Sequence, residues 1–273
     1  MLNQQTRTPI RYPGGKQRFL AQIVENLPPS TNIKGHFIEP FLGGASVYFA
    51  IQAKPAVLAD KNTELIDLYR GIRRAPSKVW QLYSSYENDK TEYYRVRRQD
   101  TTGWNVISRA ARTLYLNRTC FKGMWRQNSS GRFNTGYGGQ SRRWVITEED
   151  LIQVARALRC VKLVSSDFES IVDSAQEEDF IFLDPPYQPG CRESLINHCM
   201  YMFQQFTFES HRRLAAALDR ASARGAKWTM TTSSHEDIKS LFSGCRTVPF
   251  RVGVGDHPGH TTRCTGEMIV MNF

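Results

Sequence analysis

The hydrophobic pattern of the chain predicts an α/β protein. Short apolar segments, typical of strands buried on both faces of a parallel sheet, alternate with segments of helical spacing. The expected strands lie near residues 37–39, 56–60, 161–164, 180–183 and 228–232. The expected helices are one that ends before Pro28 and three more near residues 46–52, 147–159 and 207–225. Segments 250–254 and 267–273 pattern as a terminal antiparallel pair.

The pattern changes between about residues 63 and 144. Helical spacing begins near residues 64, 79 and 110, and the charge run 93–98 lies among these segments. A stretch with aromatic residues between basic ones follows, and its turn is expected at residues 128–131. We therefore expect a catalytic domain made of residues 1–62 and 145–273, with residues 63–144 as an inserted domain.

The candidate chemistry is concentrated where the strand at 180–183 ends. Prolines do not continue a central strand, so Asp184, Pro185, Pro186 and Tyr187 should follow at its carboxyl end, the edge where open α/β sheets bind ligands. Asp184 and the carbonyl of Pro185 can accept hydrogen bonds from an aromatic amine, and Tyr187 can stack on a heterocycle. The alternative is a proline-rich turn with a structural aspartate.

Two glycine turns precede this strand. Tyr12 and Lys16 belong to Arg-Tyr-Pro-Gly-Gly-Lys, in which the glycines allow a tight turn and the lysine offers a cation to a carboxylate or phosphate. The second turn follows the strand at 37–39 and would let a nucleoside or amino-acid moiety approach the main chain. Its candidate residues are Glu39, Pro40, Phe41, Gly43, Gly44, Ala45 and Ser46.

Further acids lie at other strand ends. Glu39 and Asp60 end the first two strands about twenty residues apart, a spacing that suits ribose hydroxyls, although either acid could cap a helix instead. Asp167 and Phe168 follow the third strand, where an acid beside an aromatic ring could hold an adenine. His257, His260 and Cys264 lack a fourth ligand with zinc-site spacing, so we expect no metal.

Composition limits the class of protein and of partner. The chain of 273 residues has 40% hydrophobic residues, and no apolar run approaches the ~20 residues that span a membrane. Its net charge of +10 favours nucleic acid as a partner. Six cysteines form no Cys-x-x-Cys pair, which indicates an intracellular, reduced protein.

The basic and aromatic side chains of the insertion are candidates for contacts with DNA. Basic side chains reach phosphates, arginine reads guanine edges and aromatic rings fill gaps left by displaced bases. The candidates are Arg95, Arg97, Arg98, Asn117, Arg118, Phe121, Lys122, Met124, Arg126, Asn134 and Tyr137. The alternative is a glycine-rich surface hairpin.

Taken in order, these motifs resemble the Dam-like DNA adenine-N6 methyltransferases over nearly the whole chain. Residues 11–16 and 39–46 resemble the cofactor motifs of that family, and residues 184–187 resemble its catalytic tetrapeptide. Residues 116–138 resemble its target-recognition hairpin. The resemblance implies a Rossmann-like S-adenosylmethionine-dependent methyltransferase sheet with an inserted helical and β-hairpin target-recognition domain.

The same resemblance implies a cofactor, a substrate and a setting. The methyl donor would be S-adenosylmethionine, held with Asp60 at the ribose and Asp167-Phe168 at the adenine, and Asp184 would act in both cofactor binding and catalysis. The substrate would be the adenine amine of double-stranded DNA, reached by base flipping. A cytoplasmic monomer, encoded by a bacterium or phage and associated with the nucleoid, would fit this activity.

The sequence departs from the family pattern at three places. Ala45 replaces a glycine of the second turn, Thr135-Gly-Tyr-Gly138 replaces the usual Val-Pro-Phe-Gly, and Ser233 or Ser234 replaces an asparagine. Ala45 supports one alternative, a DNA-binding module with a degenerate cofactor pocket. A second alternative is methylation of RNA or of a protein amide. The altered hairpin leaves the recognised DNA sequence open.

Overall fold

The computed structural model describes residues 6–128, 131–139, 146–186, 206–254 and 261–273, and a mixed seven-stranded sheet lies at its centre. The strand order is β3-β2-β1-β4-β5-β7-β6. The strands are β1 (Phe37–Glu39), β2 (Ala56–Asp60), β3 (Val161–Ser165), β4 (Phe180–Leu183), β5 (Lys227–Ser233), β6 (Arg246–Val254) and β7 (Thr261–Met271). The first five are parallel and β7 runs antiparallel to β5 and β6, so the Rossmann-like α/β expectation is confirmed.

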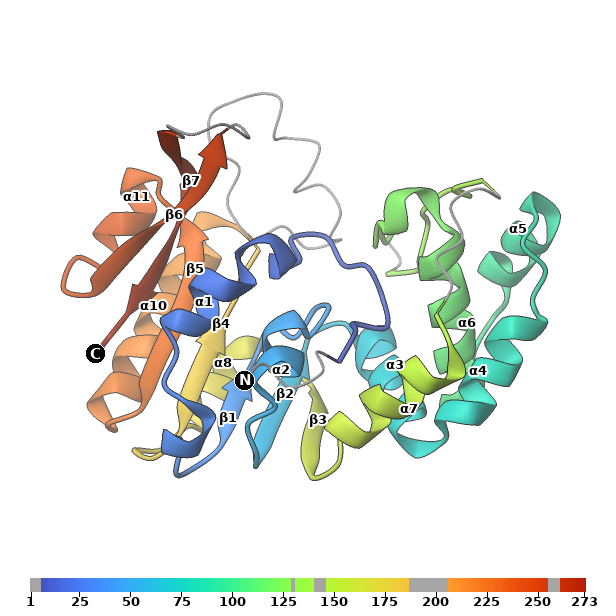
Figure 1. Cartoon of the computed structure of the whole chain (residues 1–273), viewed down its shortest axis with the longest axis horizontal. Helices are drawn as coiled ribbons and strands as arrows, with labels where there is room; N and C mark the ends of the chain where they lie inside the picture. Colours follow the sequence, from blue (N-terminus) through green and yellow to red (C-terminus); the bar gives the residue numbers. More distant parts are fainter. Residues whose placement is uncertain (1–5, 129–130, 140–145, 187–205, 255–260) are drawn as a thin grey trace.

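Helices cover both faces of this sheet (Figure 1). The short helices η1 (Lys16–Phe19), α1 (Leu20–Glu25), η2 (Ser30–Asn32) and α2 (Ser46–Ile51) lie on one side. The other side carries α8 (Phe168–Asp173), α10 (Phe208–Ala223) and α11 (Glu236–Ser240). Alternate residues of β4 enter the two resulting cores, Phe180 and Phe182 on one face and Ile181 and Leu183 on the other.

A helical lobe packs beside β3, at one end of the sheet (Figure 1). It contains α3 (Thr63–Arg74), α4 (Pro76–Ser85), α5 (Lys90–Arg98), α6 (Val106–Thr119), the 3-10 helix η3 (Phe121–Gly123) and α7 (Glu148–Ala157). Gly71 allows α3 and α6 to pack closely, since a Cβ there would lie 2.8 Å from the Val106 carbonyl oxygen. One apolar core runs from the sheet into this lobe without a break.

Local signals explain where the main helices begin. Thr147 and Asp150 form a reciprocal capping box at α7, and Thr207 accepts a hydrogen bond at the start of α10, as the sequence indicated. The charge run 93–98 falls within α5, whose first turn is capped by Asp89. The expected helix through residue 159 ends at Ala157, because Cys160 adopts a left-handed φ of 61° before β3.

The terminal antiparallel pair is longer than the sequence indicated. β6 begins at Arg246 rather than near Phe250, and it includes Pro249, beside which the pairing register shifts. A proline is tolerated there because β6 is the edge strand of the sheet and does not need every backbone N–H. His257 and His260 of the rejected metal site lie outside the described residues.

A buried aspartate fixes the turn that leads into the central strand. Asp179 accepts hydrogen bonds from the backbone N–H of His36 at 2.6 Å and of Gln176 at 2.9 Å. Gly35 is required beside it, since a Cβ there would lie 2.4 Å from the Asp179 carboxylate. This aspartate thus sets the relative position of the starts of β1 and β4, whose other ends carry the candidate site.

Replacing Asp179 by alanine should lower the free energy of unfolding by about 1–3 kcal/mol, because two backbone N–H groups lose a charged acceptor. Urea unfolding followed by circular dichroism measures this change. Glu177→Ala, which removes an exposed acid from the same turn, should stay within about 0.5 kcal/mol of the parent. Equal stability of the two variants would contradict the role given to Asp179.

Candidate active site

Asp184 lies directly beyond β4 and is held by two side chains. The Lys16 Nζ atom is 2.9 Å from Asp184 Oδ1, and the Thr231 hydroxyl donates to the same oxygen at 2.5 Å. Lys16 reaches it from the first glycine turn, where it also donates to the Gly14 carbonyl at 2.9 Å. With 6% of its side chain exposed, Lys16 is an ammonium largely removed from water. The first and central motifs therefore meet in one ion pair, in which Lys16 is buried and the Asp184 side chain is 19% exposed.

The prolines after Asp184 end the strand as expected. Pro185 is buried and Pro186 is partly exposed. Tyr187, which the sequence assigned to stacking, lies outside the described residues. Asp184 and the Pro185 carbonyl are thus the members of the tetrapeptide from which the site is built here.

Asp60 fixes the second glycine turn from the end of the neighbouring strand. Its Oδ2 accepts a hydrogen bond from the Gly43 N–H at 3.0 Å and its Oδ1 from the Asn62 N–H at 2.9 Å. Burial raises the pKa of Asp60 to about 6, against the lowering effect of these two backbone hydrogen bonds. The carboxyl end of β2 and the turn after β1 are therefore tied together, as their adjacent pairing predicts.

Tyr12 lies over the same turn. Gly43 has a φ of 46°, and a Cβ at that position would lie 3.0 Å from the Tyr12 ring, so glycine is required for both reasons. Tyr69 of α3 donates to the Gly43 carbonyl at 3.0 Å. Burial, together with the nearby Asp60, raises the pKa of Tyr12. The Tyr12 ring also lies 5.9 Å from that of Trp125, which connects the turn to the hairpin that contains Trp125.

Glu39 supplies a buried carboxyl group between the other acids. Its Oε2 atom is buried and has no hydrogen-bond partner among the described residues. Burial, reinforced by the charges of Asp184 and Asp60, raises the pKa of Glu39 well above its usual range. An acceptor left unmatched in this way is costly for the fold, and a cationic or hydroxyl-bearing ligand would satisfy it.

The remaining residues of the turn shape its backbone. Pro40 is buried, Gly44 lies against the Cβ position of Tyr12, and Ser46 begins α2. Ala45 adopts a left-handed conformation with φ 56° and ψ 27°, and its methyl group is buried in the apolar core. The methyl group of Ala45 is thus accommodated within the apolar core.

Asp167 and Phe168 lie beyond β3. Asp167 caps α8 by accepting a hydrogen bond from the Glu169 N–H at 3.1 Å. The buried Phe168 ring stacks on Phe41 at a centroid distance of 5.3 Å, and Phe41 is partly exposed. Phe206, which the sequence analysis missed, contacts both rings at 5.7 and 5.8 Å. These residues form an aromatic cluster at the same edge of the sheet as Asp60.

The hairpin presents several of its candidate side chains to solvent. Phe121 of η3 is 45% exposed, and Lys122, Arg126 and Asn134 are also exposed, while Met124 is partly so. Thr135 accepts a hydrogen bond from the Arg126 N–H at 3.2 Å and so braces the two sides of the hairpin. Tyr137 packs inward, donating to the Asn88 carbonyl at 3.0 Å.

The three arginines expected to contact phosphates have different surroundings. Arg97 donates to the hairpin carbonyls of Asn134 at 3.1 Å and Thr135 at 3.0 Å, which holds the hairpin on α5. Arg95 is paired with Glu92 at 2.6 Å, and Arg98 is exposed on the same helix. Of these three side chains, that of Arg98 is therefore the least held by other residues of the protein.

Asn117 and Arg118 lie inside the protein. The Asn117 side chain accepts from the Arg11 N–H at 2.9 Å and donates to the Arg11 carbonyl at 2.7 Å, while Arg118 donates to the Pro9 carbonyl. Both are almost fully buried. In this structure they attach the segment before Lys16 to α6.

Two further properties of the described residues bear on the class of protein. No helix among them is long and apolar enough to cross a membrane. Within the same residues, no group of three or more His, Cys, Asp and Glu side chains is arranged to hold a metal ion.

The parallel sheet with its antiparallel terminal pair, and the acids beside glycine turns at its carboxyl edge, define an α/β methyltransferase. The sequence model of the D12 class N6 adenine-specific DNA methyltransferases matches residues 12–252, so the chain belongs to this family. It is an adenine-specific DNA methyltransferase with DNA as its substrate. The expectations for fold class, reaction and family are thereby confirmed.

The chain is also similar to individual curated proteins. It is 31% identical over 240 residues to a type II methyltransferase, M1.LlaDCHI, of Lactococcus lactis subsp. cremoris, covering 85% of this chain and 83% of that protein. It is 34% identical over 250 residues to a DNA N-6-adenine-methyltransferase of Escherichia phage P1, covering 89% of this chain and 32% of that protein. A DNA adenine methylase of Vibrio cholerae is 25% identical over 244 residues, 87% of this chain and 85% of its own.

Replacing Asn117 by alanine should lower the free energy of unfolding by about 1–3 kcal/mol, since the Arg11 main chain loses both of its hydrogen bonds to Asn117. Chemical denaturation measures the loss. Asn134→Ala, an exposed position on the hairpin, should change stability by less than about 0.5 kcal/mol. If Asn117→Ala keeps full stability and instead weakens DNA binding, Asn117 contacts DNA after all.

Proposed function

We propose that this protein transfers a methyl group from S-adenosylmethionine to the N6 amine of an adenine flipped out of double-stranded DNA. The observation that carries the proposal is the buried contact of Lys16 and Thr231 with Asp184 at the carboxyl edge of the sheet. A carboxylate held in this way can accept a hydrogen bond in a defined direction. The neighbouring acids give the same edge a site for a second, positively charged ligand.

The residues at this edge fit the cofactor. Glu39 has a buried, unmatched acceptor oxygen, and an ammonium or sulfonium group is the kind of charge that it would satisfy. Asp60, at the end of the neighbouring strand, suits the ribose hydroxyls, and the partly exposed Phe41 offers a surface to the adenine ring. When bound, S-adenosylmethionine supplies a methyl group already activated on sulfur.

The chemistry left to the protein is to prepare the attacking amine. The lone pair of the adenine amine is delocalised into the ring, which makes the amine planar and a poor nucleophile. Hydrogen bonds from the amine to the Asp184 carboxylate and the Pro185 carbonyl favour the pyramidal form, whose lone pair points away from the ring. Because Lys16 and Thr231 already hold Asp184, this arrangement needs little reorganisation during the reaction.

The amine must also be reached. In a duplex the N6 amine is paired and stacked, so an enzyme that acts on it must extrude the base into its site. The Tyr187 ring is proposed to stack on the extruded adenine, and Phe121 or Met124 to fill space near it. The 45% exposure of Phe121 on η3 supports this role, because an exposed aromatic ring beside Lys122 suits contact with nucleic acid.

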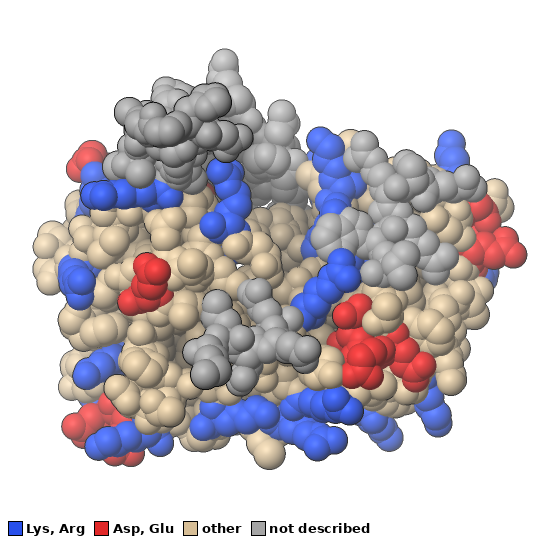
Figure 2. Space-filling model, viewed as in Figure 1, with Lys and Arg blue, Asp and Glu red and all other residues tan. Residues whose placement is uncertain are grey.

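The DNA surface is proposed to lie between the two lobes. Figure 2 shows Lys and Arg side chains on both sides of the hollow that separates the sheet from the helical lobe. They also line the opposite edge, so net charge alone does not locate the DNA. The proposed location is supported instead by the hairpin, which contacts the segment that carries Lys16 through Tyr12 and Trp125.

The remaining proposals concern the division of the chain into domains, its oligomeric state and the cell in which it works. Residues 63–144 are proposed to act as the target-recognition insertion and the rest of the chain as the catalytic domain. The protein would work as a monomer on double-stranded DNA inside a bacterial or phage-infected cell. The similarity to a type II methyltransferase suggests a partner restriction enzyme as one setting for this activity.

Replacing Asp184 by asparagine should reduce methyl transfer by about two to three orders of magnitude or more, because the amine loses a preorganised charged acceptor. The assay follows labelled methyl groups from S-adenosylmethionine into duplex DNA and identifies the modified nucleoside after digestion. We expect N6-methyladenine from the parent, and far less product from RNA of the same sequence.

Asp237→Asn serves as the matched control, since it removes an exposed carboxylate on α11 without touching the site. It should retain parental turnover within about twofold. Near-normal turnover by Asp184→Asn would remove Asp184 from the mechanism. A different methylated base in the parent reaction would overturn the proposed target amine.

Arg126 is proposed to read a base edge, and its replacement by alanine should relax specificity at one position of the recognition site. A lost base contact costs about 1–3 kcal/mol of discrimination. The measurement compares methylation rates across all single-base variants of the site, once the site is known from methylation-sensitive sequencing.

The matched control is Arg98→Ala, which removes an exposed arginine that is proposed to meet a phosphate. It should weaken all sequences alike and reduce the slope of the salt dependence by about one unit. Uniform weakening by Arg126→Ala, without any relaxed position, would contradict its role as a base reader.

A further inference from the structure

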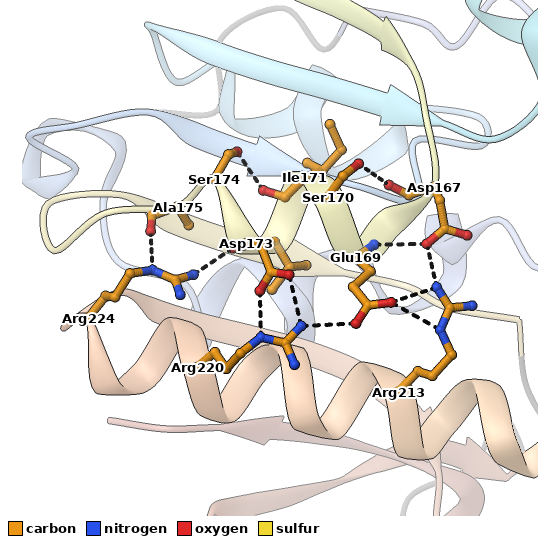
Figure 3. Close-up of polar contacts among 11 residues, drawn as sticks. Asp167, Glu169, Ser170, Ile171, Asp173, Ser174, Ala175, Arg213, Arg220 and Arg224 are labelled. Atoms are coloured by element: carbon orange, nitrogen blue, oxygen red, sulfur yellow. Dashed lines mark hydrogen bonds and ion pairs between the residues drawn. The ribbon is translucent and has the colours of Figure 1, made fainter.

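Arg213, on the first turns of α10, contacts Asp167 (Figure 3) and also Phe168, the two residues proposed to bind the cofactor adenine. Its Nη2 donates to Asp167 Oδ1 at 2.9 Å and to Glu169 Oε2 at 2.7 Å, and its Nε donates to the same Glu169 oxygen at 3.1 Å. The guanidinium carbon also lies 5.0 Å from the centroid of the Phe168 ring. One side chain therefore touches the acid and the ring together.

Arg220 of α10 and Arg224, the residue that follows this helix, contact α8 without touching Asp167 or Phe168. Arg220 donates to both carboxylate oxygens of Asp173 at 2.8 Å and to Glu169 at 3.0 Å, and Arg224 donates to the backbone of α8 and the residue after its cap (Figure 3). Their contacts and a shared apolar core already fix α8 against α10. Holding the two helices together therefore does not require Arg213.

From this geometry we propose that Arg213 is a positioning residue for cofactor recognition, which holds Asp167 and Phe168 in the arrangement that accepts the adenine ring. The inference rests on the proposed use of S-adenosylmethionine. It assigns to α10 a part in recognising the adenine base, in addition to its packing on the sheet.

The contacts of Asp167 explain how this positioning works. Its Oδ1 receives the Glu169 N–H and the Arg213 guanidinium, while its Oδ2 accepts no hydrogen bond from the described residues and has the Lys61 ammonium 4.0 Å away. Two donors on one oxygen fix the plane of the carboxylate. The second oxygen is then directed by the protein toward a donor such as an exocyclic amine.

The exposure of the ion pair argues against a mainly stabilising role. The side chains of Arg213 and Asp167 are 42% and 36% exposed, and ion pairs this accessible to water add little to folding. Loss of the Arg213 side chain should accordingly leave the fold intact. Its effect should appear in the binding of a ligand that depends on the orientation of Asp167.

The test compares two compounds by calorimetry: the product S-adenosylhomocysteine, and its inosine counterpart, in which oxygen replaces the 6-amino group. An acceptor aimed at the amine should make the parent favour the adenine compound by about tenfold or more. In Arg213→Met the dissociation constant for the adenine compound should rise by about tenfold, and the preference over the inosine compound should fall below about threefold. Turnover at saturating cofactor should stay within about twofold of the parent.

Arg220→Met is the matched control, because it removes contacts to two carboxylates on the same helix pair and leaves Asp167 and Phe168 untouched. Arg220→Met should keep the parental affinity for S-adenosylhomocysteine and the parental preference for it over the inosine compound. Arg213→Lys, which retains the charge but not the planar fork, should recover part of the preference.

The outcomes separate this inference from the proposed function. If Arg213→Met binds and discriminates like the parent, or if Arg220→Met loses the preference equally, Arg213 has no positioning role and the proposed cofactor stands. If the parent binds neither compound, the proposed cofactor itself is overturned, and the role of Arg213 with it.

Discussion

The structure depends most on one buried contact, the ion pair between Lys16 and Asp184. A carboxylate and an ammonium that leave water together are tolerated when other hydrogen bonds hold them, and here Thr231 and the Gly14 carbonyl do so. Removal of Lys16 would leave the Asp184 carboxylate without its cation and close enough to Glu39, another acid, to repel it. The first glycine turn and the central strand must therefore form together for the site to exist.

This requirement explains the arrangement of the segment before Lys16. The chain reaches the ion pair only after passing along α6, where Asn117 and Arg118 bind its backbone, and beneath the hairpin, where Tyr12 meets Trp125. Tyr12 then covers the glycine turn that Asp60 anchors. Residues from the sheet, the helical lobe and the amino-terminal segment thus share one network of backbone contacts, and the acids at the strand ends take their positions from it.

The strands and their terminal acids could be predicted from the sequence, because unbroken apolar runs and the prolines after Asp184 are local signals. Contacts between residues that are distant along the chain could not be predicted in this way. Asn117 and Arg118 belong to a polar stretch that resembles a DNA-binding surface, and their burial follows from a segment more than one hundred residues earlier. Arg213 was missed for the same reason, since its contacts lie on a helix that precedes it by over forty residues. The length of β6 was also underestimated from the sequence, because Pro249 interrupts the hydrophobic pattern without ending this edge strand.

The continuous apolar core between sheet and helical lobe has a consequence for how new sequence specificities arise in such an enzyme. The hairpin cannot be exchanged on its own, because its Trp125 side chain is part of that core. The helix that supports it, α6, also carries Asn117, which binds the backbone of the segment before Lys16. A chimera in which only the hairpin is exchanged would therefore have mismatched packing between the new hairpin and the core below it. With the hairpin in its proposed recognition role, exposed positions such as Phe121, Arg126 and Asn134 are the ones that can be substituted without disturbing the buried packing below them.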